Sequence, residues 1–195
     1  MSKNIKNIVK SAVRLKDDSG AVAMEFALIM PVLIAFYFGG VSMYDAMRAS
    51  HQTATVAVTL ADLSTRVIDM NDDKRDALFN SGRALMSKWP SETDYSISVT
   101  SIINPTEANN GDPDVLRAVS WSEATDESAK LTDADLPRFD LPTIAEGDSL
   151  VIIEVKGTYR PQHSILGTQG NFDISRSSVR RPRFVSEVHY ISDDD

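Results

Sequence analysis

Residues 20–44 read GAVAMEFALIMPVLIAFYFGGVSMY, and their only charged residue is Glu25. The 19 residues from Phe26 to Tyr44 carry no charge. A helix rises about 1.5 Å per residue, so this run is about 28 Å long, close to the thickness of the hydrocarbon core of a bilayer. The segment therefore predicts a membrane-spanning helix near the N-terminus.

Charge is divided unevenly around this segment. Residues 1–20 hold five basic and two acidic residues and so carry +3; the whole chain of 195 residues carries −8, which leaves −11 for the remainder. Basic residues that flank a membrane helix stay in the cytoplasm. We therefore expect a cytoplasmic N-terminus, a single helix at 21–44 in a bacterial inner membrane, and a periplasmic domain at 45–195.

Several functional classes find no support in the composition. The chain has no cysteine, which excludes disulfides and thiol chemistry, and its three histidines lack metal-ligand spacing. Asp69, Asn71 and Asp73 copy the first ligands of an EF-hand loop, but Lys74 and Asn80 occupy the positions that require Gly and Glu. The acidic balance argues against nucleic acid. We expect no enzyme activity, no metal or cofactor and no small-molecule substrate.

The basic leader, residues 1–20, has two interpretations: an uncleaved cytoplasmic tail, or a leader removed by a peptidase. A secretory signal is cleaved after its apolar region at a small-x-small site, and no good site follows here. Small residues precede the apolar run instead, at Gly20 and Ala21. Glu25 would cost about 2.5–3.5 kcal/mol if fully inserted. It lies either at the interface, helped by the helix dipole, or against an ammonium freed by cleavage after Gly20.

The sequence DDSGAVAMEFALIMPVLIAFYFGGVSMYDAMR, residues 17–48, resembles the N-terminus of TadE-like (TadE and TadF) pseudopilins of tight-adherence, Flp-type pilus systems. Gly20, the pair Glu25-Phe26 and Pro31 carry the resemblance. It implies processing between Gly20 and Ala21 by a prepilin peptidase. Pairing of Glu25 with the freed ammonium would set the axial register between helices, with Phe26 beside it, and Pro31 is expected to kink the helix.

The same resemblance implies a place in an assembly. Major Flp pilins carry Glu-Tyr where this chain has Glu25-Phe26, and they are far shorter, which favours an accessory subunit. The expected function is that of a non-enzymatic minor pilin, with sibling pseudopilins and the platform membrane proteins as partners. Two alternatives stay open: an uncleaved bitopic scaffold of another envelope complex, and an exported hydrolase tethered by its helix.

The helical period continues beyond the apolar run. Apolar residues recur at steps of three and four, namely Val56, Leu60, Leu63, Val67 and Met70. They predict one helix over residues 21–68, about 70 Å long. Asn71 is expected to begin a second helix, over about 72–88, that buries Leu78, Leu85 and Trp89.

After residue 90 the apolar period changes to two, which predicts strands. We expect a hairpin of strands near 95–100 and 115–121, a central strand at 150–159, and a last strand at 179–190 that closes the sheet. Residues 122–148 and 160–175 are expected to be loops. The predicted fold is α+β and pilin-like, with a long N-terminal helix, a second helix and an antiparallel sheet of about four strands.

Near the C-terminus, Arg180, Arg181 and Arg183 follow Arg176 and form a basic cluster in an acidic domain. They have two interpretations: salt bridges with the protein's own acids, or contact with anionic headgroups or with the acidic face of a partner. Alternation along a strand would place Arg181 and Arg183 on one face and Arg180 on the other.

Overall fold

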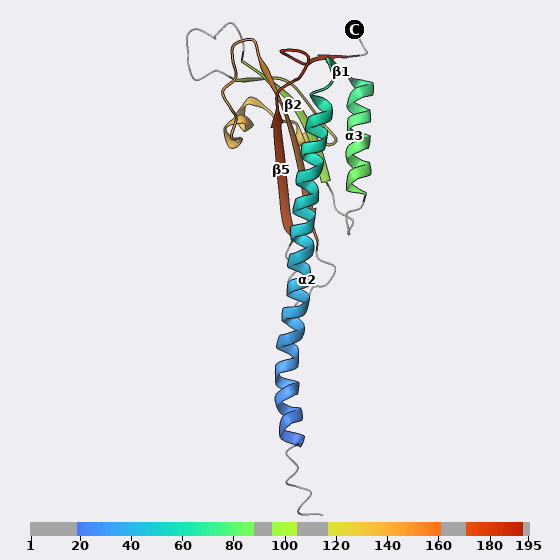
Figure 1. The fold of residues 1–195 in the computed structure, drawn as a ribbon, viewed down its shortest axis with the longest axis vertical. Helices are drawn as coiled ribbons and strands as arrows, with labels where there is room; N and C mark the ends of the chain where they lie inside the picture. The colour runs from blue at the N-terminus through green and yellow to red at the C-terminus, as the bar shows by residue number, and fades with distance from the viewer. Residues whose placement is uncertain (1–18, 88–94, 105–116, 161–170, 193–195) are drawn as a thin grey trace, which may run out of the picture.

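The computed structural model describes residues 19–87, 95–104, 117–160 and 171–192. The predicted fold class is confirmed: a long helix, a second helix and a four-stranded antiparallel sheet (Figure 1). The elements are α2 (Ser19–Ser64), β1 (Asp69–Asn71), α3 (Asp72–Met86), β2 (Tyr95–Ile103), β3 (Ala118–Ala124), the 3-10 helices η3 (Glu127–Ala129) and η4 (Asp133–Arg138), β4 (Ser149–Tyr159), β5 (Phe172–Arg180) and β6 (His189–Ile191).

Helix α2 has 46 residues and continues through Pro31, which makes it about 69 Å long. It ends four residues before the predicted Ile68. The hydroxyls of Ser64 and Thr65 donate to the carbonyls of Ala61 and Asp62, each at 3.0 Å. The Arg66 amide then donates to the Leu63 carbonyl at 3.2 Å instead of to Asp62, so the helical hydrogen-bond pattern ends here.

The four-stranded sheet has the order β3-β2-β4-β5, and every neighbouring pair is antiparallel. The predicted hairpin is confirmed as β2 and β3, although its second strand begins at Ala118. The prediction of a central strand at 150–159 is also confirmed. β4 lies between β2 and β5, and its first seven residues are all buried.

The predicted last strand, at 179–190, is wrong. Residues 172–180 form β5, so the loop expected over 160–175 ends earlier than predicted. The chain then leaves the sheet, and β6 pairs in parallel with β1 in a separate two-stranded sheet. Pro182 lacks the backbone donor that a ladder needs, and Val188 is fully buried beneath Trp121, whose indole donates to the Val188 carbonyl at 2.7 Å. Burial of this valine brings residues 188–191 back across the molecule.

Hydrophobic side chains pack on both faces of the sheet. One cluster lies between the sheet and the two helices and includes Val56 and Leu60 of α2. The other lies on the opposite face, where Leu136 of η4 covers Ile152 of β4. The segment expected to be a loop therefore forms the second layer of the core through its two 3-10 helices.

Three predictions for the apolar stripe and for α3 were wrong. Leu63 and Leu85 are exposed, by 42% and 40%, because the buried stripe of α2 runs through Val56, Ala57 and Leu60 and because α3 turns Leu85 outward. Met70 is buried but belongs to β1. Leu78 is buried as predicted, and Asn71 caps α3 by accepting from the Lys74 amide at 3.0 Å. Trp89 lies outside the described residues.

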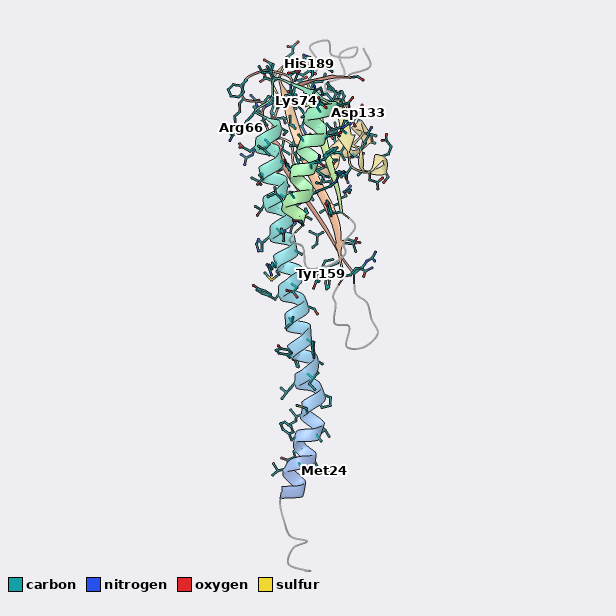
Figure 2. The ribbon with its side chains drawn as sticks, turned by 90° about the vertical axis from the view of Figure 1, so that its right-hand side faces the viewer. Met24, Arg66, Lys74, Asp133, Tyr159 and His189 are labelled. Atoms are coloured by element: carbon teal, nitrogen blue, oxygen red, sulfur yellow. The ribbon has the colours of Figure 1, made fainter. Side chains whose placement is uncertain are left out.

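Helix α2 divides into two parts by its environment. Residues 19–44, here called the stem, project beyond the sheet, and from Gly20 onward none of them is buried (Figures 1 and 2). Ala49 is the first buried residue of the helix, and from there α2 contacts α3, β4 and β5. Residues 45–192 are called the head.

Candidate functional site

The first turn of α2 contains the predicted cleavage site. Gly20 and Ala21 are both exposed, and a Cβ added to Gly20 would meet no atom within 4 Å. The rest of the predicted leader, residues 1–18, lies outside the described residues. The peptide bond after Gly20 is thus unobstructed by the head.

Glu25 follows Ala21 by four residues within the same helix, so the two lie on one face about one turn apart. Within the described residues, Glu25 is exposed and has no hydrogen-bond or ion-pair partner. Phe26 beside it is 59% exposed. An ammonium at residue 21 would meet this carboxylate from the same chain or from a neighbouring one.

Further along the stem, a shallow apolar groove of about 460 Å³ runs along one side of the helix. Its lining residues are adjacent pairs that repeat every four residues, namely Pro31, Val32, Ala35, Phe36, Gly39 and Gly40. The stem is long and apolar enough to cross a membrane by length and composition. Figure 2 shows its side chains radiating from the helix, with Met24 near its lower end.

The arginines of the C-terminal region contact acids of the head. Asp62 on α2 accepts from Arg66 at 2.6 Å and also pairs with Arg183. The hydrogen bond from Arg66, with the charges of Arg183 and Arg180, lowers the pKa of the Asp62 carboxyl. Arg181 instead binds Asp148 at 3.1 Å.

The predicted alternation of these arginines does not apply, because residues 181–183 lie outside any strand. Arg181 and Arg183 flank one shallow hollow of about 290 Å³ that is also lined by Phe184. Asp62 lies 37 residues beyond Glu25 on the same helix, which places Arg183 about 55 Å along the helix from Glu25. The cluster is therefore at the end of the head that is remote from the stem.

No group of three or more acidic or histidine side chains that could hold a metal ion occurs in the described ranges. In the candidate EF-hand segment, Asn71 caps α3 and Asp69 binds the Lys74 ammonium at 2.9 Å. His51 and His189 are exposed. These contacts leave the acidic segment at 69–73 with a structural role.

Two groupings were missed by sequence reasoning. The Tyr190 hydroxyl donates to Asp72 at 2.5 Å, and burial is the main reason that its pKa rises to about 12. Phe172 begins β5 at the lower end of the sheet and is 47% exposed. The Tyr190–Asp72 contact joins segments that are distant in sequence, so no local pattern indicates it. The start of a strand at Phe172 could have been predicted, because an aromatic residue follows Gly170 and Asn171 there.

Comparison with known proteins finds a family match in α2, the helix that contains the stem. The family model described as TadE-like protein matches residues 20–61. This part of the chain is TadE-like. The match begins at Gly20 and ends at Ala61, so it covers both the exposed stem and the part of α2 that packs in the head. No curated protein and no solved structure matches the chain.

The match lies within the helix that is long and apolar enough to cross a membrane. The match covers 42 of the 195 residues, all of them within α2, so the family relation rests on the long helix.

Proposed function

We propose that the chain is a minor pilin, or pseudopilin, that serves in the assembly of tight-adherence pili without enzymatic activity. The observation that carries the proposal is the two-part helix. One helix of 46 residues, TadE-like over residues 20–61, has an exposed apolar half and a half packed into an α+β head. A subunit built in this way can lie in a bilayer and still present a folded head to an assembly above it.

The proposed topology follows from length and charge. Residues 21–44 form the transmembrane helix, and residues 45–195 form the periplasmic domain of a single-pass inner-membrane protein. The basic leader with its charge of +3 stays in the cytoplasm, where a prepilin peptidase reaches Gly20. The exposed first turn of α2 supports access to this bond.

Cleavage after Gly20 creates a new amino group on Ala21, and Glu25 is its proposed partner. In hydrocarbon an isolated carboxylate is costly, so a pair with an ammonium on the same or a neighbouring subunit is favoured. This pairing would fix the axial register between stems, with Phe26 and the groove beyond Pro31 completing the contact. Sibling pseudopilins and the platform proteins are the proposed neighbours.

Arg180, Arg181 and Arg183 are proposed to contact an acidic face of a partner subunit. Headgroup contact fits the geometry less well, because Arg183 lies about 55 Å along the helix from Glu25, well beyond the thickness of one bilayer. Arg180 is exposed, and the Arg181 side chain is 53% exposed.

Processing is tested by co-expressing the full chain with a prepilin peptidase and measuring the intact mass and the N-terminal residue. We expect a mature N-terminus at Ala21. The control is Gly20→Val, which should remain uncleaved but folded, since the space around Gly20 is open. An intact leader on the wild-type chain would contradict the proposal and would favour the uncleaved bitopic scaffold.

Register is tested with Glu25→Gln. We expect normal cleavage but loss of co-purification with sibling pseudopilins and loss of piliation. Asp45→Asn is the matched control, because Asp45 ends the same uncharged run and has no proposed pairing with an amine. Wild-type piliation in Glu25→Gln cells would remove the register argument while leaving the topology intact.

A further inference from the structure

The lower end of the sheet lies beside the upper end of the stem. Arg176 of β5 donates to the Ser50 hydroxyl of α2 at 2.6 Å, so these two residues are level. Farther on, Arg183 pairs with Asp62, which means that β5 and α2 run in the same direction. Figure 1 shows β5 alongside α2 with this orientation.

Phe172 precedes Arg176 by four residues of strand, a distance of about 13 Å. The same distance corresponds to about nine residues of helix, so Phe172 is level with the segment from about residue 41 to Tyr44. That segment is the last part of the uncharged run. If α2 crosses a bilayer along this run, Phe172 must lie at the membrane surface.

Three aromatic residues lie near this level. Phe172 is paired in register with Tyr159, and their ring centroids are 6.3 Å apart. Tyr159 is only 3% exposed, whereas Phe172 is 47% exposed and Tyr44 of α2 is 67% exposed. Figure 2 places Tyr159 at the lower tip of the sheet, next to α2. Burial and the charge of Asp45 raise the pKa of the Tyr159 hydroxyl, which agrees with a position of Tyr159 close to Asp45 of α2.

We propose that Tyr44, Tyr159 and Phe172 form an aromatic foot by which the head rests in the interface of the same bilayer that α2 crosses. Aromatic side chains are enriched at this depth of membrane proteins. Phe172 enters the interface, while Tyr159 supports its ring from within the head. The inference rests on the proposed membrane span, and it adds a second lipid contact that limits how deeply α2 sinks and how it rotates.

The absence of cysteine from the sequence allows single-site labelling. The full chain carries an environment-sensitive fluorophore on Asn171→Cys, next to the intact Phe172, and is reconstituted in vesicles of phosphatidylethanolamine and phosphatidylglycerol. Quenchers sit either shallow or deep on the lipid acyl chains. Leu33→Cys reports on the middle of the stem, and His189→Cys reports on the remote end of the head, where Figure 2 places His189.

We expect quenching at residue 171 by shallow quenchers, at residue 33 mainly by deep ones, and at residue 189 by neither. Phe172→Ser should weaken the shallow quenching at residue 171, and Phe184→Ser, which alters an exposed phenylalanine of the remote end, should not. Quenching at residue 33 without quenching at residue 171 would overturn the foot and leave the span standing. No quenching at residue 33 would overturn the span and the foot with it. An unchanged signal in Phe172→Ser would show that the ring does not enter the interface.

Discussion

Two valines of α2 allow the packing of the helix into the head to be measured with a matched pair of variants. Val56 is 2% exposed and belongs to the core between helix and sheet, whereas Val58, two residues later, is 44% exposed. The change to alanine is chemically the same at both positions, and both lie in the same helix. The difference between the two variants therefore isolates the burial of one side chain.

The size of the effect can be estimated from burial and helix propensity. Removing two buried carbons costs about 1.6 kcal/mol of transfer free energy, and the cavity that remains adds to this. Alanine is a better helix former than valine by up to about 0.7 kcal/mol, and this gain applies at both positions. We expect Val56→Ala to lower the free energy of unfolding by about 1–2 kcal/mol, and Val58→Ala to leave it unchanged or raise it slightly.

Urea unfolding of the full chain in detergent micelles measures both values. Trp121 is a suitable fluorescent reporter, because its indole donates to Val188 and its ring lies 5.5 Å from that of Tyr190. The second tryptophan of the chain, at position 89, is replaced by phenylalanine in all variants. Equal effects of Val56→Ala and Val58→Ala would refute the packing of α2 against the sheet, and with it the two-part helix on which the proposed function rests.

Other predictions concern α3, the C-terminal strand and a surface ion pair. Gly82→Leu should destabilise the head by about 1–3 kcal/mol, since even a Cβ at this position would lie 2.5 Å from the Cδ1 of Ile97. In the same urea assay, Ala84→Leu, at an exposed position of the same helix, should be near neutral. Equal losses in the two variants would contradict the close packing at Gly82. Tyr190 has a folded-state pKa of about 12, above its ordinary value of 10, so its contribution to stability is complete below about pH 10 and is lost as the pH rises toward 12. Urea midpoints of Tyr190→Phe should therefore fall less between pH 8 and pH 11 than those of the wild type, and an identical fall would argue against this role. Arg183→Gln should change the free energy of unfolding by less than about 1 kcal/mol, because its side chain is 54% exposed; a larger loss would mean that the pair with Asp62 is better shielded from water than the structure indicates.

The sequence was most informative where one element dominates its surroundings. The stem could be predicted because the length of its 19 uncharged residues matches the thickness of a bilayer core. β4 could be predicted because its apolar residues are consecutive. β1 and β6 have three residues each, too few to show a period, and they pair only because distant parts of the chain meet. β5 reads FDISRSSVR, and two of its nine residues are buried, so it gives little apolar pattern.

The candidate site follows the same division. Gly20 and Glu25 could be singled out by their spacing relative to an apolar run. The partners of the arginines could not, because residues 181–183 leave the strand that alternation assumed. The level of Phe172 relative to the stem depends on the contact between Arg176 and Ser50, which joins residues 126 positions apart.

The continuity of α2 has a mechanical consequence. The helix runs from Ser19 to Ser64 without interruption, so no hinge separates the lipid-facing half from the half held by α3, β4 and β5. An axial force or a torque applied near Glu25 would pass Pro31 and reach the part of the helix packed in the head, which begins at Ala49, after about 36 Å of helix. A partner protein that displaces or rotates the membrane end of this protein would therefore move the stem and the head together as one rigid unit.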